Sequence, residues 1–143
     1  MVFLIGMKPI TWWQVKSRWP TLAAFPRMQA ALDRNPTRGY LGTSAHIGTR
    51  GVMVIQYWAS ADDLYNFAHD TSTIHPAAWN AWFDRERANP RATGIWHETY
   101  VVPAGGIETV YDDMPVMGLA DATGVIEVTP RSTTARQRLA GNR

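Results

Sequence analysis

Cysteine is absent from the 143-residue chain. Its absence excludes disulfide bonds, thiolate metal ligands and a cysteine nucleophile, and it suits a reducing compartment, so we expect a cytoplasmic protein. Long apolar runs are also missing, because no segment approaches the roughly 20 residues of a membrane span. The opening "MVFLIGMKPI" has no basic region before its short apolar run, so we expect no signal peptide.

The chain also lacks a large excess of charge of either sign: it has 14 Lys and Arg and 12 Asp and Glu, a formal net charge of +2. A nucleic-acid binder typically carries a basic stripe with interleaved aromatic residues. The sequence contains no such stripe, so we expect no nucleic-acid partner. Tryptophan, in contrast, is abundant. Seven of them exceed what a core of this size needs, and such a surplus often lines an apolar pocket or an interface.

The first half of the chain predicts three strands and a helix. "VFLIGMKP" is typical of a buried strand that ends at Pro9. Thr11 is placed to cap a helix that Pro20 and Pro26 interrupt. Two β-rich runs then flank "GTRG" in "YLGTSAHIGTRGVMVIQYW", which predicts a hairpin. The second run is apolar on both faces, as expected for a central strand.

The second half predicts a helix and a last strand. Ser60, with Asp63 three residues on, indicates a helix start. A further helical piece is expected from Pro76 to about Ala88, since proline is favoured at the first helical position. "IWHETYVVP" then predicts a strand.

The resulting order, β-α-β-β-α-β, is the ferredoxin-like arrangement of an α+β protein. Its open sheet carries helices on one face only. The other face is too apolar to stay in water, so we expect a homodimer that packs sheet to sheet. We assign residues 1–121 to this domain and residues 122–143 to a C-terminal extension that is partly flexible, because its end is poor in apolar side chains.

Several strings resemble a known family: "VFLIGMK", "VMVIQYW", "IHPAAWNAWF", "GIWHETYVVPAGG" and "YDDMPVMGLA". They are similar to the monooxygenase-like family that includes the small oxygenase of fungal fumagillin biosynthesis, within the antibiotic-biosynthesis-monooxygenase group of dimeric α+β barrels. The resemblance covers about residues 2–121. It implies a barrel-like dimer whose cavity lies between sheet and helices. Relatives in the wider superfamily include cofactor-independent oxygenases and several heme proteins.

His75 is the first candidate site residue. Histidine is a poor N-cap, whereas a neutral imidazole binds iron and titrates near physiological pH. His75 is therefore an ordinary residue of a helix start, an acid-base group, or the axial ligand of a heme. Heme binding is the one metal-binding role that we consider for it. Trp79, Trp82 and Phe83 follow and would form an apolar wall beside a flat ligand such as heme.

His97 and Glu98 are the other catalytic candidates. Adjacent strand positions point to opposite faces, so the two cannot serve one site from a regular strand. His97 is a candidate base. Glu98 shares a face with Trp96 and Tyr100, and it either pairs with Arg85 or Arg87 or acts as a general base beside Tyr100.

Three functions remain open at this point. The first is a monooxygenase-like enzyme that acts on an apolar small molecule in the barrel cavity. The second is a heme-binding protein or heme enzyme with a histidine axial ligand. The third is a non-catalytic dimer that binds a small ligand.

Overall fold

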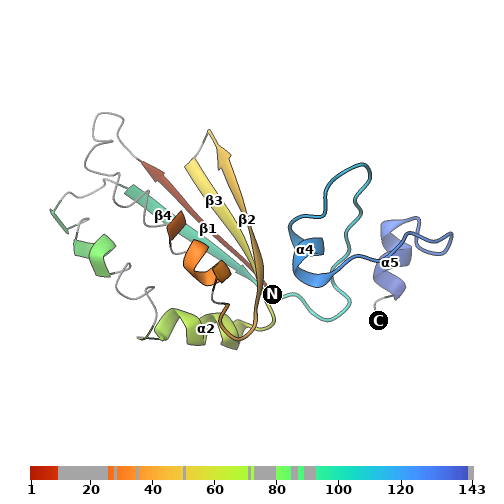
Figure 1. The fold of residues 1–143 in the computed structure, drawn as a ribbon, viewed down its shortest axis with the longest axis horizontal. Helices are drawn as coiled ribbons and strands as arrows, with labels where there is room; N and C mark the ends of the chain where they lie inside the picture. Colours follow the sequence, from red (N-terminus) through yellow and green to blue (C-terminus); the bar gives the residue numbers. More distant parts are fainter. Residues whose placement is uncertain are drawn as a thin grey trace.

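A computed structural model describes residues 1–9, 26–27, 29–34, 36–49, 51–70, 72, 80–84, 87–88 and 93–141 of the chain. Four strands and three complete helices lie within them (Figure 1): β1 Val2–Pro9, β2 Tyr40–Gly48, β3 Gly51–Trp58, α2 Ala61–His69, β4 Thr93–Tyr100, α4 Leu119–Thr123 and α5 Ala135–Gly141. Residues 29–34 and 80–84 are also helical. Most of the helix expected after Thr11, and the start of the one expected at Pro76, lie outside the described residues.

The strands form one antiparallel sheet in the order β2-β3-β1-β4. β1, the first strand in the chain, pairs with both β3 and β4 and is therefore central. This is the strand order of the ferredoxin-like fold, and the predicted α+β class is confirmed.

The predicted hairpin at "GTRG" joins β2 to β3, with Gly48 opposite Gly51. Gly51 has φ +116°, a region that side chains disfavour. A Cβ atom there would also lie 2.1 Å from the carbonyl oxygen of Met7. Only glycine therefore fits where the hairpin meets β1.

Helix α2 begins as the sequence predicts. The Ser60 hydroxyl accepts a hydrogen bond from the Asp63 amide at 3.1 Å and donates to the Asp63 carboxylate at 2.6 Å. These bonds satisfy one of the free amides of the first turn. At the other end, the His69 ring lies 2.8 Å from the Tyr65 carbonyl oxygen and packs on the Tyr65 ring, so this histidine closes the helix.

Strand β4 ends three residues earlier than expected, at Tyr100. Its partner explains the difference: β1 begins at Val2, which is opposite Tyr100. Residues 101–103 therefore have no neighbouring strand to pair with.

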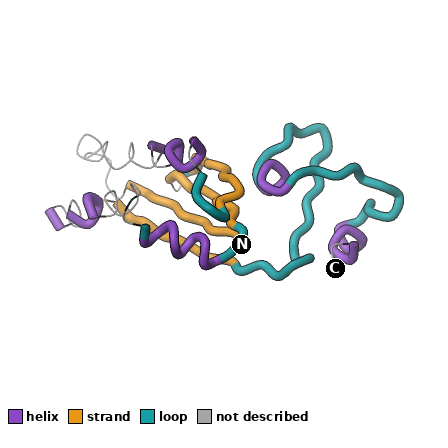
Figure 2. Tube along the Cα trace, turned by 60° about the horizontal axis from the view of Figure 1, so that its bottom comes forward, coloured by secondary structure: helices purple, strands orange, loops and turns teal. Residues whose placement is uncertain are grey.

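The two faces of the sheet differ in what covers them. One face, here called the helix-facing face, carries Val54, Gln56 and Trp58 of β3, and the helices pack on it through contacts from Gln29 and Phe67. The core lies here: Trp58 is fully buried and Val54 is 2% exposed. The opposite, open face carries Leu4, Ile55 and Trp96. Figure 2 shows α2 running alongside the strands.

After β4 the chain runs to one end of the sheet, where α4 packs against β2. Helix α5 follows, within the extension expected to be partly flexible, and it was not predicted. It is held by Arg138, whose Nε lies 2.7 Å from a carboxylate oxygen of Glu108, with both side chains largely buried. Among the described residues, no helix is long and apolar enough to cross a membrane.

Candidate active site

The helix-facing surface of the sheet is the candidate active site. In the register of β1 with β4, His97 is opposite Ile5 and Glu98 is opposite Leu4. Because strand side chains alternate, His97 shares its face with Ile5, and Glu98 points to the open face. The predicted separation of these two residues therefore holds, and Glu98 cannot join His97 in one site of a single protomer.

His97 lies at the β4 end of the helix-facing surface. Its ring centroid is 5.7 Å from that of Phe3, with the rings tilted at 37°. Its side chain is exposed in the single chain. An imidazole beside an aromatic ring on an apolar surface is suited to exchange a proton with an apolar ligand that carries one acidic group.

Glu98 pairs with Tyr100 on the open face, where the phenol hydroxyl donates to the carboxylate at 2.5 Å. This hydrogen bond, and then the negative charge of Glu98, raise the pKa of Tyr100. The expected alternative partner Arg87 pairs instead with Asp84 at 3.3 Å, and Arg85 lies outside the described residues.

The remaining predicted site residues lie around helical residues 80–84. Trp82 and Phe83 pack edge to face, with ring centroids 4.9 Å apart. His75 and Trp79 lie outside the described residues. Within the described part of the chain, no three His, Asp or Glu side chains gather in a way that could hold a metal ion.

A chain of hydrogen bonds crosses the helix-facing surface, and the sequence analysis missed it. The indole Nε1 of Trp58 donates to Oε1 of Gln56 at 3.2 Å, and Nε2 of Gln56 donates to Oε1 of Gln29 at 3.0 Å. The Gln29 amide in turn donates to the Tyr40 hydroxyl at 2.7 Å and to the Asp33 carboxylate at 3.0 Å.

Tyr40 completes this chain, since its hydroxyl also donates to Asp33 at 2.5 Å. Burial, and after it the hydrogen bond and charge of Asp33, raise the pKa of Tyr40 above its usual range. The phenol therefore stays a donor, and every bond of the chain leads from the buried Trp58 towards the Asp33 carboxylate. The chain fixes helical residues 29–34 over β3.

One signal in the sequence points to this chain of hydrogen bonds. Gln56 is the single polar residue within the apolar run "VMVIQYW", and it is only 9% exposed. A buried amide needs partners. One of them, Trp58, is two positions later, but the other, Gln29, is 27 positions earlier, a distance that a local sequence pattern does not bridge.

These features define an α+β protein of ferredoxin-like fold, whose sheet carries His97 and a chain of hydrogen bonds on the face that the helices cover. The chain belongs to the family Monooxygenase af470-like, whose model matches residues 1–119. The membership supports a monooxygenase-like function and confirms the resemblance to monooxygenases.

Several solved structures are similar to the chain at low sequence identity. SnoaB, a cofactor-independent oxygenase from Streptomyces nogalater, is 12% identical, with 71% of this chain and 91% of that chain covered and a TM-score of 0.48. Rv0793 from Mycobacterium tuberculosis is 12% identical, with 72% and 97% covered and a TM-score of 0.47. A monooxygenase from the gene ActVA-Orf6 of Streptomyces coelicolor, in complex with nanaomycin D, is 14% identical, with 72% and 92% covered and a TM-score of 0.40. No curated protein sequence matches the chain significantly.

Proposed function

We propose that the protein is a monooxygenase-like enzyme that acts on an apolar small molecule bound against the helix-facing surface of the sheet. The observation that carries the proposal is the position of His97, whose imidazole lies beside the apolar ring of Phe3 on that surface. The family supports the reaction class.

In the form that needs no cofactor, the substrate itself supplies the two reducing electrons that convert the second oxygen atom of dioxygen into water. His97 accepts a proton from an acidic carbon or hydroxyl of the substrate, and the resulting anion passes an electron to dioxygen. Over the whole reaction the substrate loses two hydrogen atoms and gains one oxygen atom, and the second oxygen atom leaves as water. The apolar walls exclude solvent from the anion.

The test is oxygen uptake with a dihydroxyanthrone, an apolar and conjugated probe with an acidic methylene group. We expect His97→Ala to lower the rate about 10²–10⁴-fold, the usual contribution of a general base. His46→Ala is the matched control, because His46 is exposed on the edge strand β2 and bonds to Ser44. His75→Ala and the double variant are measured alongside. Activity that survives loss of both His75 and His97 would remove the proposed base, and saturable binding without oxygen uptake would favour the non-catalytic alternative.

Heme binding through His75 is a second candidate, suggested by the edge-to-face pair of Trp82 and Phe83 in helical residues 80–84. Here His75 would be the axial ligand, and Trp79, Trp82 and Phe83 would pack beside the porphyrin. Bound heme would supply oxygen activation. Titration with hemin tests this proposal: a saturable Soret shift that His75→Ala abolishes supports it, and the absence of a shift rules it out.

We also propose a homodimer that forms through the open face. Leu4, Ile55 and Met53 share this face with Trp96 and Tyr100, which are 40% and 51% exposed. Apolar side chains gathered on one face in this way typically mark an interface, and the Glu98 carboxylate among them is bonded to the Tyr100 hydroxyl. Sedimentation of Ile55→Glu should give a monomer where the unmodified protein gives a dimer. Ile126→Glu is the control, because Ile126 is 88% exposed and lies beyond α4. A monomeric unmodified protein would refute the proposal.

A further inference from the structure

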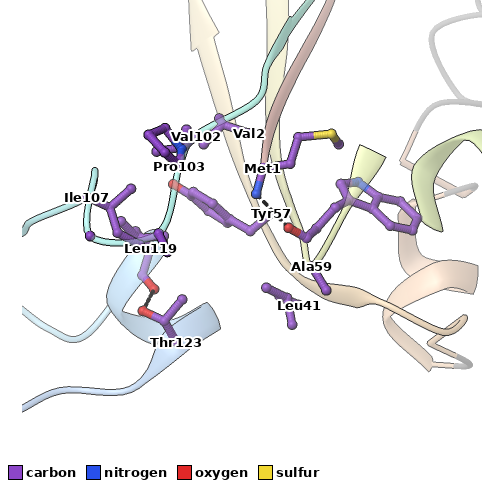
Figure 3. A pocket seen from close by; sticks show the side chains of 13 residues that line it. Met1, Val2, Leu41, Tyr57, Ala59, Val102, Pro103, Ile107, Leu119 and Thr123 are labelled. Atoms are coloured by element: carbon purple, nitrogen blue, oxygen red, sulfur yellow. Dashed lines mark hydrogen bonds between the residues drawn. The ribbon is translucent and has the colours of Figure 1, made fainter. Parts of the chain in front are cut away.

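A cavity lies at the end of the sheet, between the start of β1, the end of β3 and the segment that follows β4 (Figure 3). Its volume is about 190 Å³. Helix α4 closes one side of it. Its lining is mostly apolar: Met1, Val2, Leu41, Tyr57, Val102 and Leu119 are among the residues that contribute.

Most polar groups around this cavity are bonded to the backbone. The amino group of Met1 donates to the carbonyl oxygen of Trp58 at 2.7 Å. The Thr123 hydroxyl donates to the Leu119 carbonyl oxygen at 2.7 Å. Neither group is therefore available without breaking a bond that the fold already makes, and the lining has no charged side chain.

The Tyr57 hydroxyl differs from these groups. Tyr57 is 9% exposed, and Figure 3 shows its ring crossing the cavity with the hydroxyl directed towards Pro103 and Ile107. Among the described residues none exchanges a hydrogen bond with this hydroxyl. The neighbouring phenol of Tyr111, in contrast, donates to the Met117 carbonyl oxygen at 2.6 Å. Burial, and then the proximity of Tyr111, raise the pKa of Tyr57, so its hydroxyl remains a donor at neutral pH.

The Tyr57 hydroxyl is free to donate to a molecule that enters the cavity, because no acceptor among the described residues occupies it. A ligand that offers an acceptor atom there gains a hydrogen bond at a site that is otherwise apolar. We propose that this cavity binds a small, neutral, apolar molecule whose acceptor oxygen is held by the Tyr57 hydroxyl. The cavity is smaller than the roughly 300–1,000 Å³ of sites for drug-sized ligands, which favours a molecule with a single ring or a short chain. A charged ligand is disfavoured because none of the described lining residues has a charged side chain, and the Met1 ammonium there is already bonded to the Trp58 carbonyl oxygen.

The proposed site is independent of the proposed oxygenase function. Tyr57 is on the open face, since it pairs with Val2, two positions from Leu4. His97 belongs to the helix-facing surface. The two sites therefore lie on opposite sides of the sheet, and a failure of either leaves the other unaffected.

The test compares two probes of nearly equal shape by fluorine NMR titration of the full chain. Para-fluoroacetophenone carries an acceptor carbonyl, and para-fluoroethylbenzene lacks it. We expect saturable binding of the ketone, tighter than that of the hydrocarbon. Tyr57→Phe should weaken ketone binding about five- to tenfold, the effect of one lost hydrogen bond, and leave hydrocarbon binding unchanged.

Two further variants make the result decisive. Tyr65→Phe is the matched control, since Tyr65 is 64% exposed on α2, and it should bind both probes normally. Leu119→Trp should fill the cavity and abolish binding of both. The proposal is overturned if the ketone does not saturate, if Tyr57→Phe leaves the ratio of the two affinities unchanged, or if a folded Leu119→Trp variant still binds the ketone.

Discussion

The side-chain amide of Gln56 donates to the side-chain oxygen of Gln29 at 3.0 Å, and this bond joins the centre of the sheet to the helix that covers it. Gln56 also accepts from the buried indole of Trp58. The N–H group and the oxygen of the Gln56 amide are therefore both hydrogen-bonded between the sheet and the helix. Interactions of this kind fix the position of a helix more sharply than apolar packing does, because they work at one geometry only.

Replacing Gln56 with Leu should lower the free energy of unfolding by about 1–3 kcal/mol, since it leaves the Gln29 oxygen and the Trp58 N–H without their partner. Adding Gln29→Leu should cost less than the sum of the two single changes. Urea denaturation measures all three variants. The exposed Asn66→Leu on α2 is the control and should change stability by less than about 0.5 kcal/mol. Strictly additive effects would contradict the coupling.

Tyr40 predicts a dependence of stability on alkaline pH. Its pKa is raised in the folded protein, so above about pH 10, the usual tyrosine value, the folded state retains a proton that the unfolded state has lost. The stabilisation is complete below that pH and declines as pH rises through the window above it. Urea denaturation at pH 8 to 11 should therefore show a smaller alkaline loss in Tyr40→Phe than in the unmodified protein. Equal losses would contradict the role of Tyr40, and Tyr65→Phe is the control.

The effect of Gly6→Ala on the free energy of unfolding should change sign when Trp96 is also replaced. A Cβ atom at Gly6 would lie 2.5 Å from the indole Nε1 of Trp96, so Gly6→Ala alone should destabilise the protein by roughly 1 kcal/mol. In a Trp96→Ala background the clash is absent, and alanine should stabilise the strand by about 0.5–1 kcal/mol relative to glycine. Gly48→Ala, which meets nothing within 4 Å, controls for the substitution itself. The same sign in both backgrounds would show that Trp96 is not the obstacle.

Arg138 predicts a local effect in the C-terminal segment. Its guanidinium bonds to Glu108 and to the carbonyl oxygens of Ser132 and Thr133. Arg138→Ala should release α5 and increase thermolysin cleavage at Val125–Val128. The free energy of unfolding of the sheet, measured with urea, should stay within about 0.5 kcal/mol of the unmodified value. Arg136→Ala, on an exposed part of the same helix, should leave cleavage unchanged. A large loss of sheet stability would show that the segment belongs to the core.

The sequence by itself determined the strands, the β2–β3 hairpin, the Ser60 cap and the separation of His97 from Glu98, because each depends on neighbours a few residues apart. Alternation along a strand and the bond from Ser60 to Asp63 are local. Family strings within about residues 2–121 also indicated the monooxygenase class, and the family model, which matches residues 1–119, confirms it.

Only the tertiary structure decided which side chains meet across the fold. Gln56 finds Gln29 across 27 positions of the chain, and the Tyr57 hydroxyl faces a cavity that α4 closes from more than 60 positions away. Such contacts depend on how sheet, helices and C-terminal segment pack together. A pattern of neighbouring residues carries no information on them, because a side chain's burial and its partners are set by the elements that fold against it.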